Sequence, residues 1–381
     1  MRIALVVPFF LPVIGGMETH AHELGLELTA RGHKVEILTA NMDHSGSRAG
    51  KQEEMIDGIL VRRYPVWLRL GKFASFWPRF VSDLSRYDII HVQSMRQPHT
   101  DLGLVFGKLN GKKVVFSTQS PLHKGTHGRL MEIAILAYDN IVLPLISRFY
   151  DCIYAHHQAE KEYLVAHGVP ERLVRVVHLG VGREAFREWP GGFFKKIRRR
   201  GGKILLFVGR LSNMKGLDLL LRAFSIAGKK HRNWQLVLVG PDGGELDKLK
   251  RLQAELGVRN VHFWGTLTEG DVEKACADAD LFVLPSIYEP YGLVLIKAMA
   301  KGVPAIAMDR GGPTEIIKDG KTGLLSKYDP KSLSACMELL FSDDKLRKRM
   351  GASAKKWSRK FTLKKMVDEY ERSYLEVLKG G

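Results

Sequence analysis

Short apolar runs that alternate with helical patterns along the whole chain constrain the fold more than any other feature. Each run is about as long as a buried β-strand, and helical segments separate most of them. This alternation is typical of β-α-β units and predicts parallel sheets covered by helices. We predict strands at residues 3–7, 34–39, 60–64, 89–93, 113–118, 152–156 and 174–178, and again at 204–208, 235–239, 261–264, 281–284, 304–308 and 322–325.

The segment 281–317 predicts where an anion binds. Its first strand ends in Pro285 and opens into a loop that carries Glu289 and Gly292, and a helical pattern follows from Leu293. The backbone N–H groups of Tyr291 and Leu293 would then lie at a helix N-terminus, where a phosphate is favoured. The next strand ends in a Gly-Gly pair, which places pliable backbone at the carboxyl edge of the sheet, where open α/β sheets bind ligands.

Four segments in a fixed order carry a resemblance to a known family. They read MRIALVVPFFLPVIGGMETHAHELGLELTARGHKVEILTA, ILLFVGRLSNMKGLDLLLRAF, LVLVGPDGGELDKLKRLQAELGVRNVHFWGTL and LFVLPSIYEPYGLVLIKAMAKGVPAIAMDRGGPTEII. Together they resemble the retaining GT-B glycosyltransferases of family 4, also called glycosyl transferases group 1, over roughly residues 1 to 320. The resemblance implies a GT-B fold, in which two Rossmann-like, doubly wound parallel-sheet domains face a cleft.

The resemblance also implies domain roles. Residues 1–185 are expected to form the acceptor domain and residues 203–360 the nucleotide-sugar donor domain, with a basic linker at 186–202. Residues 361–381 are expected to form a helix that crosses back to the first domain.

The family pattern assigns roles to individual residues. Arg210 and Lys215 would hold the donor diphosphate, and Glu289 would accept hydrogen bonds from hydroxyls of the donor sugar. Further donor contacts are expected from Gly15, Gly16, Gly209, Gly240, Tyr291, Gly292, Leu293 and Lys297. Contacts with the acceptor or the sugar are expected from Glu18, Gln119 and His123.

The chain departs from the family pattern at three places. Lys297 stands where the family usually has a second glutamate, whose carboxylate accepts hydrogen bonds from the nucleotide ribose. An ammonium has no acceptor, so Lys297 would instead contact a phosphate or reach a different group through water. Gln119 stands where the family commonly has a histidine, and His123 follows four residues later. Residues 179–182 read LGVG where the family tends to have NGVD.

The residue types favour a reaction that needs no metal. A nucleoside diphosphate leaving group gains negative charge, which an arginine and a lysine can stabilise. The donor segments contain no Asp-x-Asp motif for a divalent ion. We therefore expect retaining, metal-independent transfer of a hexosyl unit from a UDP- or GDP-sugar to a lipid-linked or polysaccharide acceptor, without a cofactor. A sugar-nucleotide epimerase, an enzyme with a soluble acceptor of the trehalose or glycogen type, and a non-catalytic glycan-binding protein stay open as alternatives.

Composition adds expectations about compartment and partners. Cys152, Cys276 and Cys336 have the spacing of neither a disulfide framework nor a zinc site. The chain shows no signal peptide, and the apolar region 131–146 is too short and too polar to span a bilayer, so a cytoplasmic protein is expected.

The formal net charge of +18 indicates an acidic partner. Segments 66–80 and 193–200 mix basic and aromatic residues and could contact an anionic membrane, which would place the protein on the inner face of the plasma membrane. Alternatively, 66–80 is a helix packed on its own domain and 193–200 is a solvated linker. No nucleic-acid-binding motif accompanies either segment.

Overall fold

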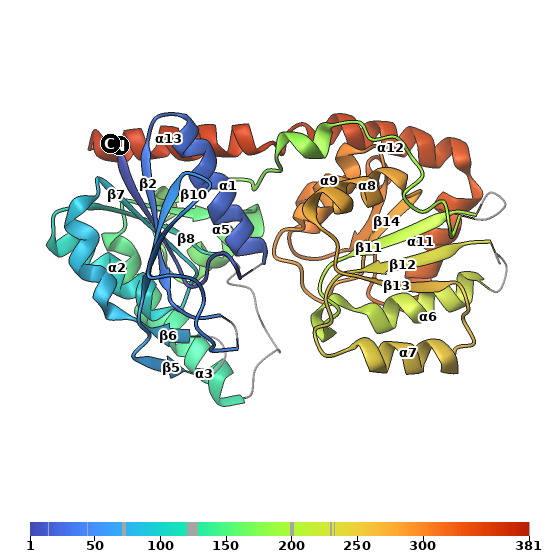
Figure 1. Cartoon of the computed structure of the whole chain (residues 1–381), viewed down its shortest axis with the longest axis horizontal. Coiled ribbons are helices and arrows are strands. Elements are labelled where there is room, and N and C mark those ends of the chain that lie inside the picture. Colours follow the sequence, from blue (N-terminus) through green and yellow to red (C-terminus); the bar gives the residue numbers. More distant parts are fainter. Residues whose placement is uncertain are drawn as a thin grey trace. The chain divides into compact units, whose positions relative to one another are not determined.

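A computed structural model of the chain describes residues 1–13, 15–43, 45–70, 74–119, 129–198, 202–228, 231 and 233–380. The chain divides into two compact units. The first consists of Met1–Leu179 and Leu363–Gly381, and the second of Gly180–Thr362. Each unit is built on its own parallel β-sheet (Figure 1).

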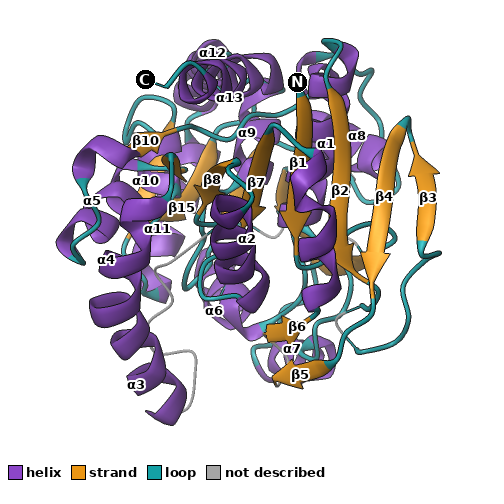
Figure 2. Cartoon of the chain, turned by 90° about the vertical axis from the view of Figure 1, so that its left-hand side faces the viewer, coloured by secondary structure: helices purple, strands orange, loops and turns teal. Residues whose placement is uncertain are grey.

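The first unit contains an eight-stranded sheet with the strand order β10-β9-β8-β7-β1-β2-β4-β3 (Figure 2). Every neighbouring pair is parallel except β3 with β4. The strands are β1 Arg2–Val7, β2 Lys34–Ala40, β3 Glu53–Ile56, β4 Ile59–Tyr64, β7 Ile89–Gln93, β8 Lys113–Ser117, β9 Cys152–Ala155 and β10 Val174–Val176. The helices are α1 Gly16–Ala30, α2 Pro98–Leu109, α3 Arg129–Ala137, α4 Leu143–Ile146, α5 Gln158–Ala166 and α13 Leu363–Leu378.

The second unit contains a six-stranded, wholly parallel sheet with the order β13-β12-β11-β14-β15-β16. The strands are β11 Ile204–Val208, β12 Gln235–Val239, β13 Val261–Gly265, β14 Leu281–Leu284, β15 Ala305–Met308 and β16 Gly323–Ser326. The helices are α6 Leu217–Gly228, α7 Leu246–Glu255, α8 Glu269–Asp278, α9 Leu293–Ala300, α10 Pro313–Ile316, α11 Pro330–Ser342 and α12 Asp344–Ser358. This is the doubly wound Rossmann order, and it confirms the predicted fold class of two Rossmann-like parallel-sheet domains.

Each sheet has one point where the strand order reverses. In the first unit β1 lies between β2 and β7, and in the second unit β11 lies between β12 and β14. Loops that leave the two strands at such a point diverge to opposite faces, which opens a crevice at the carboxyl edge. The fold alone therefore places a ligand site after β11 and β14, and a second one after β1 and β7.

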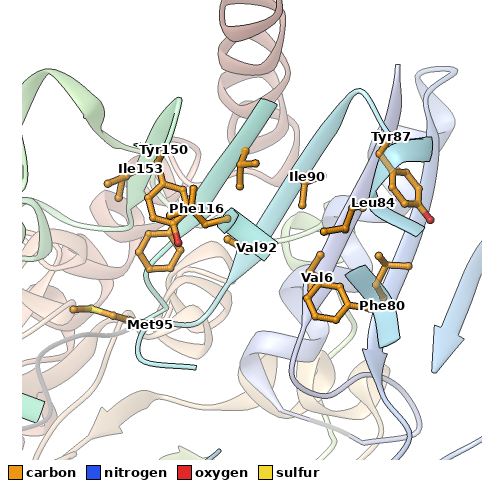
Figure 3. Close-up of a cluster of buried hydrophobic side chains, with 14 of the residues drawn as sticks. Val6, Phe80, Leu84, Tyr87, Ile90, Val92, Met95, Phe116, Tyr150 and Ile153 are labelled. Carbon is orange, nitrogen blue, oxygen red and sulfur yellow. The ribbon is translucent and has the colours of Figure 1, made fainter. Parts of the chain in front are cut away.

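Buried aliphatic strands form the core of each unit, as the short apolar runs predicted. In β1, all residues from Ile3 to Val7 have no exposed surface. Val6, Ile90, Val92, Phe116 and Ile153 share one cluster, packed against aromatic and aliphatic side chains of neighbouring segments (Figure 3). Burying each such side chain contributes roughly 1.5–3 kcal/mol, so this cluster holds the sheet of the first unit rigidly beneath its loops.

The expectation of a helix at 66–80 is wrong. The strands β5 Leu68–Leu70 and β6 Ala74–Phe76 form an antiparallel pair, and residues 71–73 between them lie outside the described part of the chain. A 3-10 helix begins at Pro78, where the proline ring suits the first turn. Trp77 and Phe80 are buried, whereas Trp67 is 61% exposed. The aromatic residues therefore divide between the core and the surface instead of lining one helix face.

The basic segment 193–198 is not a solvated linker. Phe194 is fully buried, and its N–H donates to the Asp278 carboxylate at 2.7 Å. The Arg198 guanidinium pairs with Asp280 at 2.6 Å. This part of the segment therefore packs on the second unit, while residues 199–200 lie outside the described residues. Over the described chain, no helix is long and apolar enough to cross a membrane.

Candidate functional site

The loops that follow β11 and β14 meet at the reversal point of the second sheet. The Ile287 N–H donates to the Met214 carbonyl at 2.9 Å. Gly216 has φ +61°, and a Cβ placed there would lie 2.1 Å from the Pro285 carbonyl oxygen. Only glycine fits such a close approach in this left-handed conformation, so the glycine of the first loop lets the second loop pack on it.

These loops bring a cation and a carboxylate together. The Lys215 ammonium donates to Glu289 Oε2 at 2.7 Å, and the Ser286 hydroxyl donates to the same oxygen at 3.1 Å. The side chains are 24% exposed for Lys215 and 13% exposed for Glu289, so both stay accessible to a ligand. The structure thus joins two residues that lie far apart in the sequence and that we predicted for one site.

Glycine backbone surrounds the start of the β11 loop. Gly240 at the end of β12 has φ +144°, and a Cβ there would lie 2.0 Å from the Gly209 carbonyl oxygen. Arg210 follows Gly209 and is exposed. Its side chain passes close to Gly243, where a Cβ atom would lie 2.9 Å from the Arg210 Cγ. The predicted residues Gly209, Arg210 and Gly240 therefore lie at one carboxyl edge.

The segment from Glu289 to Gly292 is held from the other side by the Gly311–Gly312 turn. The Gly312 N–H donates to the Glu289 carbonyl at 3.1 Å, and a Cβ on Gly312 would lie 2.4 Å from the Tyr291 Cα. Gly292 has φ +102° and immediately precedes α9, which begins at Leu293 as predicted. The N-terminus of α9 therefore lies beside Glu289, and its dipole favours a negatively charged group there.

Lys297 is held elsewhere. Its ammonium contacts the Glu269 carboxylate at the start of α8, and Glu273 lies 4.0 Å away. Burial raises the pKa of Glu273, while Lys301, 3.1 Å away, acts in the opposite direction. These contacts tie Lys297 to α8, and its contact with the donor stays a prediction.

Sequence reasoning missed Arg310. It follows β15, and its guanidinium lies 4.3 Å from the centre of the Tyr328 ring. The Tyr328 hydroxyl in turn lies 3.2 Å from the position of a Cβ on Gly216. Within the described part of the chain, the buried Nη2 of Arg310 has no hydrogen-bond partner. The sequence feature that could have indicated Arg310 is its position between the apolar run 304–308 and the Gly311–Gly312 pair.

In the first unit, Gly15 and Glu18 form one feature. Gly15 caps α1 in an extended conformation, and a Cβ there would lie 2.3 Å from Glu18 Oε2. Glu18 is 3% exposed, so its carboxylate is folded back over the N-terminus of α1. Gly16 has open space around its Cα. The geometry assigns Gly15 and Glu18 to the helix start, and their contacts with donor or acceptor stay predictions.

Gln119 belongs to a strained cluster at the carboxyl ends of β7 and β8. It has φ +50° and donates through Nε2 to Gln93 Oε1 at 3.1 Å. Ser94 and Arg96 also have positive φ, +84° and +61°. Such conformations cost about 1–3 kcal/mol each and gather at ligand sites. Sequence reasoning found Gln119 but missed Ser94 and Arg96. His123 lies outside the described residues.

Buried histidines lie beneath the first-unit site. His91 in β7 bonds Ser117 Oγ and the Tyr374 hydroxyl, both at 2.7 Å. Burial lowers the pKa of His91, His20 and His156 to about 3, so these rings are neutral at physiological pH. His91 is thus a core residue of the sheet. As for metals, the described residues contain no group of three His, Cys, Asp or Glu side chains placed to hold an ion.

Comparison with known proteins matches both units to glycosyltransferases. The family model Glycosyltransferase Family 4 matches residues 14–184, and the model Glycosyl transferases group 1 matches residues 192–357. An uncharacterised glycosyltransferase of Methanocaldococcus jannaschii is 28% identical over 93% of each chain. A D-inositol 3-phosphate glycosyltransferase of Corynebacterium jeikeium is 32% identical over 55% of this chain and 53% of its own length. The crystal structure of Anabaena HepE with UDP and glucose superposes with a TM-score of 0.79 at 20% identity over 98% of each chain.

Proposed function

Because the chain belongs to the glycosyl transferases group 1 family, we propose that it transfers a hexosyl unit from a UDP- or GDP-sugar, with retention of configuration, to a lipid-linked or polysaccharide acceptor. The carrying observation is the Lys215–Glu289 pair at the strand-order reversal of the second sheet. The donor nucleotide would occupy this carboxyl edge. The reported complex of HepE with UDP and glucose supports a uridine nucleotide as the first candidate.

The charges of the site suit the departure of a nucleoside diphosphate. Arg210 offers a planar guanidinium to phosphate oxygens, and Lys215 offers a compact ammonium at the start of α6. As the bond from the sugar to the phosphate breaks, negative charge grows on the phosphate, and fixed cations stabilise that state more than the bound donor. These cations would supply the charge that a divalent ion supplies elsewhere, so we propose transfer without a metal.

Glu289 would position the donor sugar. Lys215 and Ser286 hold its Oε2, which fixes the plane of the carboxylate and directs it to accept hydrogen bonds from sugar hydroxyls. For retention we propose a front-face substitution, in which the leaving phosphate accepts the proton of the acceptor hydroxyl. The protein then needs no nucleophile of its own, and its contribution is position and charge.

An apolar surface on the first unit supports an acceptor presented at a membrane. A helical arm runs from α3 through residues 138–142 to α4 (Figure 2), and it exposes Ile133 by 58%, Ile141 by 62% and Leu145 by 61%. Exposed arginines, Arg129 and Arg148, lie at its two ends, as anionic headgroups would favour. Its exposed apolar residues are Met131, Ile133, Leu136, Ile141, Val142, Leu145 and Phe149. Trp67, directly before β5, is also exposed, so the proposed contact through 66–80 is retained. The basic segment 193–200 belongs to the second unit, and its contact with an anionic membrane is a separate proposal.

Turnover with a panel of UDP- and GDP-hexoses and extracted membrane lipids tests the function. We expect release of one nucleoside diphosphate, unchanged by a chelator, with a product of the donor's anomeric configuration by NMR. Glu289→Gln should lower kcat about 100-fold, because the sugar loses a charged hydrogen-bond acceptor at its site. Hydrolysis or transfer to soluble polyols only, as the D-inositol 3-phosphate enzyme's name suggests for that relative, would contradict the lipid acceptor.

Vesicle co-sedimentation tests the membrane surface separately. Ile133→Ser with Ile141→Ser should abolish binding to vesicles of phosphatidylcholine with phosphatidylglycerol, because it removes exposed apolar area. The matched control is Leu339→Ser, an exposed leucine on α11 of the second unit. If the wild type, the double isoleucine variant and Leu339→Ser all bound vesicles equally, the proposed membrane contact would be contradicted. The proposal for the donor site would be unaffected.

A further inference from the structure

A cation-lined cavity lies in the second unit around Trp357. It measures about 510 Å³, within the range of small-molecule sites. Its lining residues come from the loop before β16, from α12 and from Lys360, two residues beyond that helix. Lys318, Lys321, Arg349, Lys356 and Lys360 bring positive charge, and no lining residue is acidic.

The positive charge of this cavity is not neutralised by the protein. Every charged side chain from Lys345 to Lys360 is a cation. Within the described ranges, none of the five cations that line the cavity forms an ion pair, and the neighbouring Asp319 accepts from the Leu325 N–H instead. Clustered like charges repel one another. An unpaired group of cations around a hollow is therefore suited to an anionic ligand.

Trp357 gives the cavity a fixed wall. Its indole N–H donates to the Ile316 carbonyl at 2.9 Å, which sets the orientation of the ring. The ammonium of Lys318 lies 3.7 Å and that of Lys360 lies 4.2 Å from the ring centre. These cation–π contacts hold both lysines against the ring without cancelling their charge. Two of the cavity's cations are thus positioned before any ligand arrives.

The cavity is separate from the donor site. Gly320 and Thr322 precede β16 and so lie at the amino edge of the parallel sheet, whereas Arg210, Lys215 and Glu289 follow the carboxyl ends of their strands. We propose that the Trp357 cavity is a second anion site, which binds a ligand that carries two or more phosphoryl groups. Lysine and arginine are the usual partners of phosphoryl oxygens, and several cations can engage a di- or triphosphoryl group at once. The proposal does not depend on the donor chemistry.

Calorimetry with tripolyphosphate tests the site. The double variant Arg210→Ala with Lys215→Ala provides the background, because it removes the donor-site cations. In this background we expect one remaining binding event. Adding Lys318→Gln with Lys360→Gln should weaken it about tenfold, since two charge contacts are lost. The matched control adds Lys345→Gln with Lys348→Gln, which removes the same charge from exposed positions of α12 outside the cavity. It should change affinity by less than about twofold.

Further experiments distinguish a lipid headgroup from a free phosphate compound as the source of the phosphoryl group. Vesicles of phosphatidylcholine with and without phosphatidic acid show whether a lipid headgroup or a free phosphate compound is preferred, and either preference supports the site. Trp357→Phe should fold normally and lose the change in tryptophan fluorescence on binding. Absence of binding in the donor-site background, equal weakening by both lysine pairs, or equally tight binding of single-stranded DNA would overturn the proposal.

Discussion

At the scale of residues, glycines decide where the candidate donor site can form. Gly216 combines a positive φ with a backbone contact that no side chain tolerates, and it lies next to Lys215. Gly240 and Gly312 make similar close approaches to backbone of the neighbouring loops. The ion pair of Lys215 with Glu289 thus depends on backbone that only glycine permits. Its own contribution to stability is modest, because both groups are partly exposed.

Gly216→Ala should therefore destabilise the protein by about 2 kcal/mol and weaken nucleotide binding, because the added methyl group displaces the β14 loop. Urea unfolding and calorimetry measure the two effects. Gly228→Ala, at the end of α6 with open space around it, is the matched control and should be neutral or slightly stabilising. If Gly216→Ala behaved like Gly228→Ala, the close approach of the two loops would not exist in solution.

At the scale of elements, Lys297 shows how a side chain on α9 can serve a neighbouring helix. The sequence showed only that a carboxylate of the family pattern had become an ammonium. The structure explains the change locally, because Glu269 and Glu273 on α8 face that position. Sequence reasoning could not find this partner, since Lys297 and Glu269 lie 28 positions apart and meet only because the two helices pack together.

Lys297→Glu should consequently lower stability by about 1–2 kcal/mol, because it adds a third carboxylate to Glu269 and Glu273, and burial already raises the pKa of Glu273. Thermal unfolding measures this effect, and Lys297→Gln should lie between the variant and the wild type. A clear gain in nucleotide affinity with an unchanged melting temperature would instead show that the position faces the ribose, as its family counterpart does.

The buried histidines between α1, β7, β9 and α13 make the first unit sensitive to acid. Burial lowers the pKa of His20, His91 and His156 to about 3, whereas the unfolded chain binds protons near 6.5. Between these values the unfolded state holds more protons, so stability falls as pH drops from about 6.5 towards 3. Each histidine contributes a slope of up to about 1.4 kcal/mol per pH unit.

Urea titrations at several pH values measure that slope. In His91→Gln the slope should become shallower by about one proton, although the variant is less stable at pH 7 because it loses bonds to Ser117 and Tyr374. An unchanged slope would show that His91 is protonated in the folded protein and would contradict its place in the core.

At the scale of the whole molecule, the alternation of apolar runs predicted the thirteen parallel strands to within a few residues, because a buried parallel strand is apolar on both faces. The same signal failed for β3, β5 and β6, which are short strands in antiparallel pairs with mixed sequences. The aromatic spacing of 66–80 favoured a helix, but an antiparallel strand pair splits these residues between core and solvent.

Some residues of the candidate sites were predicted from the sequence and others were missed. Arg210 and Glu289 were named through the family resemblance, and the sheet order brings the loops that carry them to one carboxyl edge. Arg310 was overlooked although it stands between a predicted strand and a Gly-Gly pair. The strained conformations of Ser94 and Arg96 depend on three-dimensional contacts that no spacing encodes. The net charge of +18 was visible, but its gathering around Trp357 was not, because summing over long stretches hides a local cluster.

The central claim is that the carboxyl edge of the second sheet binds a nucleotide-sugar donor through Arg210 and the Lys215–Glu289 pair. The most direct measurement is isothermal titration of the protein with UDP, GDP and ADP and their hexose conjugates, with magnesium and with a chelator. We predict micromolar binding of one nucleoside diphosphate, unaffected by magnesium and lost in Arg210→Ala. Absence of binding to every nucleotide, or equally tight binding by Arg210→Ala, would contradict the claim.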